Sequence, residues 1–289
     1  MAVLAALGRT VELRVAVMPT THGLRAAVRL PAELTQPRSL EELRLPTRVL
    51  DGLRRFADAD AGMLLVTGPA GSGKTTTIYA LLSYLTQRWP GLSVIALEDP
   101  VERDLPGVTQ IEVSPFGQLT YERALRSILR QDPQVLMLGE VRDRDTAALA
   151  VQAALSGHRL IATRHAGAPG GAIARLLEMG LEPYQLTSAL FGVVAQRLLR
   201  RLGDAGRYSG RTPVAQMAIV DDAVRRAILD RRDATALQEA LLHQSGYQTL
   251  RGAAEALVAA GETDEDEVRR VLGDPTSAPE TGRSAQPGG

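Results

Sequence analysis

Residues 68–77 have the types and spacing of a loop that binds phosphate groups. The run is Gly-Pro-Ala-Gly-Ser-Gly-Lys-Thr-Thr-Thr, which reads G-x-x-x-x-G-K-T from its first glycine. Its three glycines permit backbone angles that other residues avoid, so the main chain can come close to an anion. Backbone N–H groups and the N-terminus of the following helix then hold the phosphates. We therefore predict that a nucleotide is bound by Gly68, Pro69, Ala70, Gly71, Ser72, Gly73, Lys74, Thr75 and Thr76.

Lys74 and Thr75 carry the part of this motif that depends on charge and metal. In loops of this pattern the lysine reaches the terminal phosphates and the hydroxyl ligates Mg²⁺. Lys74 is the only lysine among the 33 lysine and arginine residues. The ammonium of lysine is a compact point charge, whereas the guanidinium of arginine is planar and wide. The only lysine therefore occupies the position in the phosphate-binding loop where a compact cation is needed. We expect ATP and Mg²⁺ as ligands; the alternative is a glycine-rich turn in an ordinary α/β domain.

Carboxylates follow two further apolar runs. Residues 135–139 are followed by Glu140, which could hold Mg²⁺ through water or orient an attacking water. Residues 97–102 place Glu98, Asp99 and Glu102 at the end of another run. Glu98 could polarise a water near the γ-phosphate, whereas the alternative is a solvated acidic turn.

Histidine and arginine residues near these runs have two interpretations each. His165 follows an apolar run and could contact the γ-phosphate, although a histidine at a strand end is often only a structural residue. Arg126 and Arg130 share one helix face at a spacing of i, i+4. They could pair with acids, or contact a nucleotide or a neighbouring subunit, and the sequence does not separate these alternatives.

Alternating strands and helices must position these side chains. Apolar runs at 63–67, 93–97, 135–139 and 159–163 alternate with helical segments, one of which, at 75–84, follows the glycine-rich loop. Such alternation predicts an α/β fold with a parallel sheet flanked by helices. Ligands gather at the carboxyl ends of parallel strands, where polar or glycine residues follow each of the four runs.

The flanking regions have other patterns. Residues 11–17 and 24–30 alternate apolar and polar residues around a turn, which predicts a hairpin with one buried face. A linker with a short helix at 40–43 and then a helix at 48–58 follow. Beyond residue 183 we predict helices at 183–200, 221–230, 233–245, 249–260 and 264–272. The predicted domains are 1–47 (hairpin and linker), 48–200 (nucleotide domain) and 201–273 (helical domain), with a disordered tail at 274–289.

Composition narrows the class of protein. The 289 residues are 45% hydrophobic and only 3% aromatic, so the core must be built mostly from Leu, Val and Ala. The formal net charge of +0 argues against a strongly basic nucleic-acid protein. There is no cysteine, which excludes disulfides and cysteine-based zinc sites. No apolar stretch approaches the roughly 20 residues of a membrane span, and the first seven residues are too short for a secretory signal, so we expect a soluble, cytoplasmic protein.

Together these motifs resemble the ATPases of type II secretion and type IV pilus assembly. The similarity extends over roughly residues 10–272. The run Leu-Arg-Gln-Asp-Pro at 129–133 favours the assembly and secretion branch over the pilus-retraction branch. The matching stretches are Gly68–Thr77 (Walker A), Ala96–Glu102 (Asp box), Leu125–Asp143 (into Walker B), Gly157–His165 (His box) and Ala195–Leu198 (a helix after the His box).

The resemblance implies a RecA-like P-loop core, a small N-terminal domain, and hexameric rings with nucleotide between subunits. It also implies that ATP hydrolysis moves an inner-membrane platform protein, so the protein would be cytoplasmic and peripheral to the inner membrane. By this resemblance Lys74 and Thr75 bind phosphate and Mg²⁺, and Glu140 is the catalytic or metal-positioning acid. Glu98 is a water-polarising acid and His165 contacts the γ-phosphate.

The chain also departs from the family pattern. The N-terminal domain is far shorter than usual, with only its final hairpin matched. In family members, arginines of that domain act on the active site of a neighbouring subunit. Arg29 is the best match to them, and Arg14 and Arg25 are alternatives. Arg142, outside that domain, is a further candidate contact. The tetracysteine module is absent, so no zinc is expected. In the His box, Arg164, Ala166 and Gly167 replace the common Leu, Thr and Asn.

Three functions compete on these observations. The first is a hexamer-forming Mg-ATPase that powers secretion or pilus-like assembly. The second is a nucleotide-binding scaffold with little turnover, motivated by the short N-terminal domain and the altered His box. The third is a nucleic-acid-handling motor, against which the zero net charge and the few aromatic residues count. We therefore expect no nucleic-acid partner.

Overall fold

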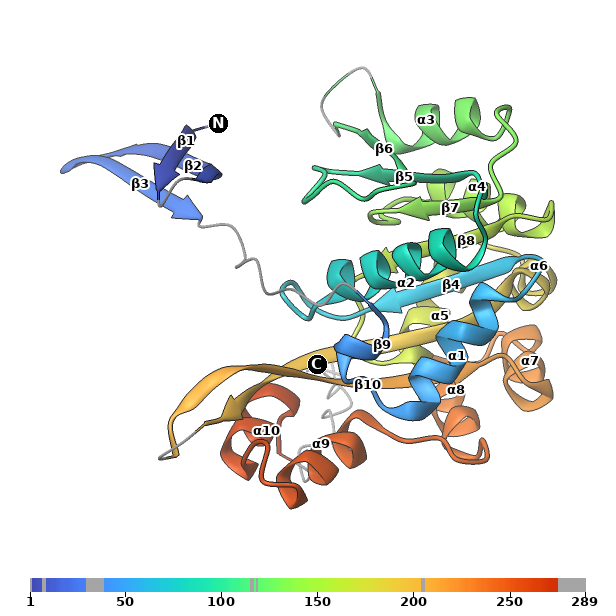
Figure 1. The fold of residues 1–289 in the computed structure, drawn as a ribbon. Coiled ribbons are helices and arrows are strands. Elements are labelled where there is room, and N and C mark those ends of the chain that lie inside the picture. Colours follow the sequence, from blue (N-terminus) through green and yellow to red (C-terminus); the bar gives the residue numbers. More distant parts are fainter. Residues whose placement is uncertain are drawn as a thin grey trace, which may run out of the picture. The chain divides into compact units, whose positions relative to one another are not determined.

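A computed structural model describes residues 2–6, 9–29, 39–114, 117, 119–203 and 206–274. The chain divides into two compact units, Met1–Pro37 and Arg38–Gly289 (Figure 1). The predicted tail lies outside the described residues, apart from Asp274. Each unit is considered by itself below.

The first unit is a three-stranded antiparallel sheet of β1 (Ala2–Ala6), β2 (Arg9–Thr20) and β3 (Gly23–Arg29). The predicted hairpin is confirmed as β2 and β3, with Val15 opposite Val28 and a tight turn between Thr20 and Gly23. The predicted buried face is wrong for this unit: Val17, Leu24 and Val28 are 58%, 77% and 53% exposed. The three strands form a single layer, and no other described element of the unit covers it. Strand β1 was not predicted.

The second unit contains a seven-stranded sheet in the order β10-β9-β4-β8-β7-β5-β6. All neighbours are parallel except β10, which runs antiparallel to β9. The four predicted strands are confirmed as β4 (Gly62–Thr67), β5 (Val94–Glu98), β7 (Val135–Leu138) and β8 (Arg159–Arg164). Strand β6 (Thr109–Glu112) was missed because it is short and half polar.

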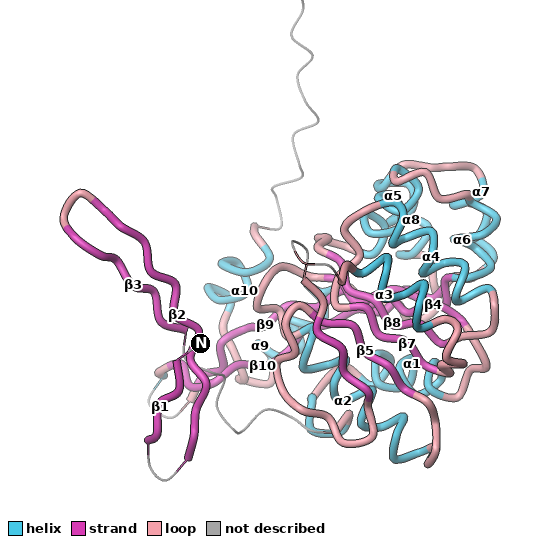
Figure 2. Tube along the Cα trace, turned by 90° about the horizontal axis from the view of Figure 1, so that it is seen from above, coloured by secondary structure: helices cyan, strands magenta, loops and turns pink. Residues whose placement is uncertain are grey.

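Helices cover both faces of this sheet (Figure 2). Met63 and Leu65 of β4 belong to the core beneath one set of helices, and Leu64 and Val66 to the core beneath the other. This two-sided burial explains why the strands are continuous apolar runs. One face carries α1 (Thr47–Ala57) and α2 (Lys74–Arg88); the other carries α3 (Tyr121–Ile128), α4 (Arg144–Leu155), α5 (Pro169–Glu178), α6 (Pro183–Ala189), α7 (Asp222–Leu229) and α8 (Ala234–Leu242). The predicted short helix before α1 is the 3-10 helix Glu41–Leu43.

The helix predicted over residues 183–200 is wrong. Helix α6 ends at Ala189, and β9 (Leu190–Leu202) begins directly after it and pairs with β10 (Tyr208–Ile219). Residues 190–199 are mostly apolar and include the β-branched Val193 and Val194, which favour a strand between two neighbours over a helix. The stretch Ala195–Leu198 therefore lies on a strand beside β4.

The C-terminal helices pack against the β9–β10 hairpin. The helices predicted at 221–230, 233–245, 249–260 and 264–272 are confirmed as α7, α8, α9 (Leu250–Ala259) and α10 (Glu265–Leu272). Leu199 and Val214 of the hairpin form a small core with Leu250, Ala254 and Val268. In the part of the chain that the structure describes, no helix is both long enough and apolar enough to cross a membrane.

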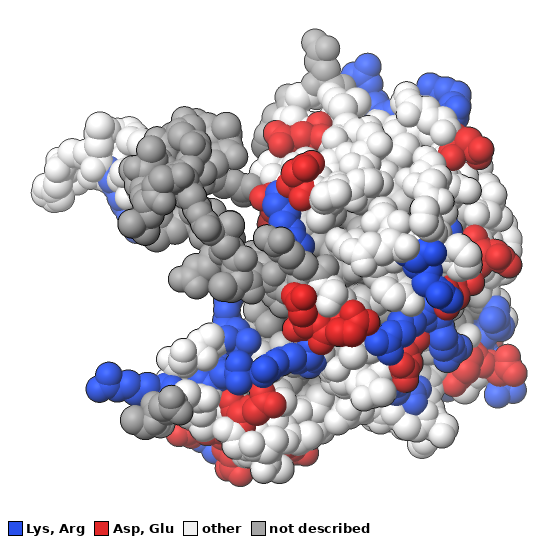
Figure 3. Space-filling view, in the orientation of Figure 1, with Lys and Arg blue, Asp and Glu red and all other residues white. Residues whose placement is uncertain are grey.

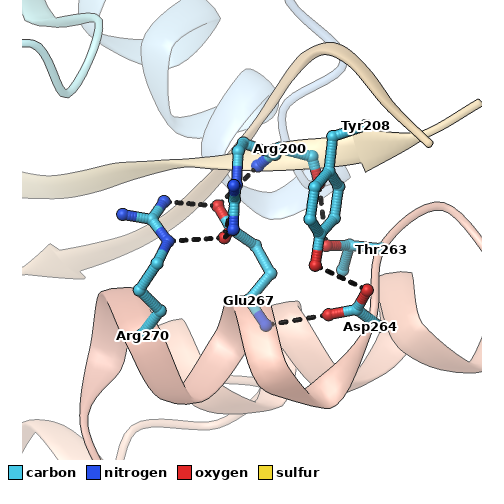
Figure 4. Close-up of polar contacts among 6 residues, drawn as sticks. All are labelled: Arg200, Tyr208, Thr263, Asp264, Glu267 and Arg270. Carbon is cyan, nitrogen blue, oxygen red and sulfur yellow. Dashed lines mark hydrogen bonds and ion pairs between the residues drawn. The ribbon is translucent and has the colours of Figure 1, made fainter.

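A buried carboxylate joins α10 to the hairpin (Figure 4). Glu267 is fully buried and accepts hydrogen bonds from Arg270 at 2.6 Å and from the backbone N–H and guanidinium of Arg200 at 2.8 Å. Arg200 stacks on the ring of Tyr208, whose hydroxyl donates to Asp264. The hydrogen bonds from Arg270 and Arg200 lower the pKa of Glu267 to about 2, against the effect of burial.

The hairpin is the most basic feature of the face drawn in Figure 3. Lysine and arginine side chains gather over it at the lower left of that view. Those of the hairpin and its turn are Arg197, Arg200, Arg201, Arg207 and Arg211. The zero net charge therefore conceals a local concentration of positive charge.

We predict that Glu267→Gln destabilises the protein at neutral pH and that the loss shrinks in acid. The pKa of Glu267 in the folded protein is about 2, below its ordinary value of 4.5. Its ionised form therefore stabilises the fold above pH 4.5, and this contribution disappears as the pH falls towards 2. The full shift corresponds to about 3 kcal/mol. Because Arg200 and Arg270 are 43% and 55% exposed, we expect about 2 kcal/mol.

Urea unfolding at about pH 7 and about pH 3 measures this difference. Glu255→Gln removes an exposed carboxylate from the neighbouring helix α9 and is the matched control, with an expected change within about 0.5 kcal/mol. A Glu267→Gln loss of equal size at both pH values would contradict the prediction.

Candidate active site

The glycine-rich loop connects the end of β4 to the start of α2, as predicted. Gly68, Gly71 and Gly73 all have positive φ angles, of 152°, 74° and 88°. A Cβ atom on Gly68 would lie 2.6 Å from the carbonyl oxygen of Gln196 on β9. The loop therefore needs glycine at position 68 for two reasons, its backbone conformation and the close approach of a neighbouring strand.

The ammonium of Lys74 lies within this loop. Its Nζ donates hydrogen bonds to the carbonyl oxygens of Gly68 at 2.8 Å and Pro69 at 3.0 Å. Partial burial lowers the pKa of Lys74 despite the nearby carboxylate of Glu140, and the charge of Arg197 lowers it further. Two partly buried cations thus lie near one another, a setting in which an anionic ligand would be favourable.

Six of the predicted site residues line one cavity of about 150 Å³ at the carboxyl edge of the sheet. Its walls come from the start of α2, the ends of β5, β7 and β8, and helix α3. Of the predicted residues it contains Lys74, Thr75, Glu98, Glu140, Arg142 and His165. Convergence at this edge is what the strand pattern predicted.

Glu140 and His165 lie next to each other in the lining of the cavity. Nε2 of His165 lies 3.4 Å from a carboxylate oxygen of Glu140, whose other oxygen pairs with Arg142 at 2.7 Å. Nδ1 of His165 lies 3.1 Å from the carbonyl oxygen of Gly68. Because a carbonyl oxygen can only accept, Nδ1 is the donor in this contact. The imidazole thus links the phosphate-binding loop to the acid after β7.

Glu98 is buried at the end of β5 and is held by two side chains that the sequence did not single out. The hydroxyl of Tyr79 donates to one of its oxygens, and Nε2 of Gln110 donates to the other at 2.8 Å. Burial raises the pKa of Glu98, while these two hydrogen bonds act in the opposite direction. The carboxylate therefore has a fixed orientation and gains a proton more readily than a solvated glutamate does.

Thr75 and Glu140 offer oxygen donors for a magnesium ion. Both line the cavity, and hydroxyl and carboxylate oxygens are ligands that suit Mg²⁺. Among the described residues, no group of three or more histidine, aspartate or glutamate side chains forms a ready metal cluster. This donor set fits an ion that keeps several waters and is shared with a phosphate, as Mg²⁺ commonly is.

The predicted arginine contacts fall into three groups. Arg142 lines the cavity, whereas Arg126 and Arg130 do not: Arg126 pairs with Glu122 at 3.0 Å on exposed α3, and Arg130 donates to the carbonyl of Arg126 at 2.9 Å. The side chains of Arg29 and Arg14 lie outside the described residues, and Arg25 is exposed.

The altered His-box residues leave the cavity intact. Arg164 is buried and donates to the carbonyl of Val141 at 2.9 Å, so it does not line the cavity. The carbonyl of Gly167 accepts a hydrogen bond from Arg197 at 3.0 Å. Sequence reasoning missed Arg197 because residues 195–198 were expected on a helix rather than on a strand beside the loop.

The sequence and fold match a known family. A family model described as "Type II/IV secretion system protein" matches residues 1–270. The chain belongs to this family. The type II secretion system protein HxcR of Pseudomonas aeruginosa is 41% identical over 286 residues, covering 92% of this chain and 60% of that protein. The type IV pilus assembly ATPase PilB of Thermus thermophilus is 35% identical over 280 residues, covering 83% of this chain and 31% of that protein.

Solved structures agree with the family assignment. The pilus retraction motor PilT with bound ADP superimposes with a TM-score of 0.76 at 28% identity, over 95% of this chain and 77% of that chain. The ATPase DotB of Legionella pneumophila superimposes with a TM-score of 0.73 at 21% identity, which supports the fold alone. The expected RecA-like P-loop fold is confirmed. The chain spans about three fifths of the length of the type II secretion relatives, 60% for the first of them.

We predict that Gly68→Ala destabilises the nucleotide-free protein more than Gly71→Ala does. Both residues have positive φ, which costs an alanine roughly 1–2 kcal/mol. A Cβ at Gly71 meets no atom within 4 Å, so this cost should be the whole effect. A Cβ at Gly68 would meet the Gln196 carbonyl and the Ser72 hydroxyl, which raises the expected loss to about 3 kcal/mol or more. Urea unfolding measures both, and equal losses would contradict the close approach of β9.

Proposed function

We propose that this chain is a Mg-dependent ATPase that acts as a motor of type II protein secretion or type IV pilus-like assembly. The observation that carries the proposal is the convergence of Lys74, Glu140 and His165 on one cavity beside a phosphate-binding loop. In the proposed reaction, a water oxygen bonds to the γ-phosphorus while the bond to the bridging oxygen of ADP breaks. The proton that the water loses passes to a carboxylate or to the phosphate released.

Each residue of the cavity has a role in this proposal. Lys74 neutralises the terminal phosphates, and Thr75 with Glu140 holds Mg²⁺, which when bound offsets the negative charge of the phosphates. Glu140 also orients the attacking water, and His165 contacts the γ-phosphate from the loop side. Glu98 polarises the water, and its hydrogen bonds from Tyr79 and Gln110 fix the direction of its carboxylate.

Assembly and location are proposed from the resemblance to the family. We propose a hexameric ring with nucleotide between subunits, docked on an inner-membrane platform protein at the cytoplasmic side of the inner membrane. Arg126, Arg130 and Arg29 are the arginines we assign to a neighbouring subunit's site. Arg126, on α3, and Arg130, in the turn after it, are both exposed, which supports this assignment. No zinc and no nucleic acid take part.

One observation favours a second candidate, a nucleotide-binding scaffold with little turnover. Within a single subunit, Lys74 is bound by loop carbonyls and Glu140 is paired with Arg142. Both groups must exchange these partners before they can act on a nucleotide. A chain that lacks a neighbour to drive this exchange would bind ATP without hydrolysing it.

We predict that the ATPase rate per subunit rises with protein concentration and falls at least about a hundredfold in Glu140→Gln. Lys74→Ala should lower both the ATPase rate and the affinity for ATP, because the ammonium that neutralises the phosphates is then missing. Phosphate release in Mg²⁺ and ATP measures the rate, and titration calorimetry measures binding. Glu255→Gln, which changes an exposed residue of α9, should have the same ATPase rate and ATP affinity as the parent.

The outcomes separate the two candidates. Tight ATP binding with no turnover at any concentration favours the scaffold over the motor. A Lys74→Ala variant that hydrolyses ATP as fast as the parent would overturn both.

A further inference from the structure

Gln196 is a buried glutamine of β9 that contacts the phosphate-binding loop from outside the cavity. Its side chain makes two hydrogen bonds to the loop and its helix: Nε2 donates to the carbonyl oxygen of Ser72 at 3.0 Å, and Oε1 accepts from the hydroxyl of Thr77 at 2.8 Å. Gln196 is only 2% exposed and Thr77 only 1%. One amide therefore connects the middle of the loop to the first turn of α2.

The loop is packed tightly against this same residue. A Cβ on Gly73 would lie 2.8 Å from Nε2 of Gln196, and a Cβ on Gly68 would lie 2.6 Å from its backbone oxygen. A Cβ at Gly68 would thus collide with the backbone of Gln196, and a Cβ at Gly73 would require the Gln196 amide to shift. The approach of β9, as well as the phosphate, restricts the sequence of the loop.

The direction of the Ser72 carbonyl matters for phosphate binding. In a planar trans peptide the C=O and N–H bonds point in opposite directions. When the Ser72 carbonyl points to Gln196, the N–H of Gly73 in the same peptide points away from it. Without that hydrogen bond the peptide could rotate and present a carbonyl oxygen to the phosphates, which would repel them.

We propose that Gln196 is a positioning residue that holds the loop in its phosphate-binding shape before the nucleotide arrives. This inference rests on the proposed nucleotide binding and names a further residue for the same site. Gln196 can perform this role because β9 is held on both sides, by β4 and β10, and beyond it by the contact of Arg200 with Glu267. A preorganised loop loses less conformational freedom on binding, and so binds more tightly.

The test compares two buried glutamines on neighbouring strands. Gln196→Met keeps the size of the side chain and removes both hydrogen bonds. Gln216→Met is the matched control: Gln216 is 4% exposed on β10, and its Oε1 accepts from the backbone N–H of Leu250 at 2.9 Å, away from the loop. We expect Gln196→Met to weaken ADP binding about tenfold or more and Gln216→Met to leave it within about twofold. Titration calorimetry measures affinity, and urea unfolding measures stability for both.

A second pair of variants tests the coupling directly. Thr77→Val removes the hydroxyl that donates to Gln196, so it should weaken ADP binding when introduced into the parent. Introduced into Gln196→Met, it should cause little further loss of affinity. Gln196→Glu keeps the acceptor for Thr77 but loses the donor to Ser72 and adds a negative charge near the phosphates. We expect it to bind ADP no better than Gln196→Met does.

The outcomes distinguish this inference from the proposed function. If the parent binds no ADP, the proposed function is overturned, and the positioning role that rests on it is overturned as well. If the parent binds ADP and Gln196→Met binds it equally well, the positioning role is overturned while the function stands. If both glutamine variants lose affinity in step with their loss of stability, Gln196 is only a structural residue and the inference is overturned.

Discussion

The geometry of the site depends on one constraint: the peptide groups of the loop at 68–73 must turn their N–H groups towards a phosphate. A backbone can do this only with glycine at positive φ and with its carbonyls bound elsewhere. Here the Ser72 carbonyl is bound by Gln196. The order of the sheet, with β9 directly beside β4, supplies the neighbour that makes this possible. The remaining strands bring Glu98, Glu140 and His165 to the same edge.

The sequence predicts the centre of this arrangement well. Strands β4, β5, β7 and β8 are buried on both faces, so each is a continuous apolar run that stands out from its surroundings. Because parallel strands end at one edge, the residues after them were expected to meet, and Glu98, Glu140 and His165 do line one cavity. Arg126 and Arg130, for which the sequence left open ion pairs or contacts with a nucleotide or a neighbouring subunit, are exposed and do not line this cavity.

Sequence patterns failed where the structure depends on distant neighbours. Residues 183–200 are apolar without a clear period, and only the pairing with β4 and β10 makes their second half a strand. That error concealed Gln196 and Arg197. Gln196 contacts residues more than a hundred positions away in the sequence, and Arg197 contacts the carbonyl of Gly167 in a loop. The partners of Glu98 were concealed for the same reason, because Tyr79 looks like an ordinary apolar position of α2 and Gln110 lies on a short polar strand.

Strand β9 has a mechanical property that follows from its extended backbone. Between Gln196 at the loop and Arg200 at α10 the chain rises about 13 Å over four residues, and a strand that is already extended cannot lengthen. At one end it is fixed to the phosphate-binding loop, and at the other to a buried ion pair. Because β9 is also paired with β4 and β10, it sets a fixed distance between the contact of Gln196 with the loop and the contact of Arg200 with α10.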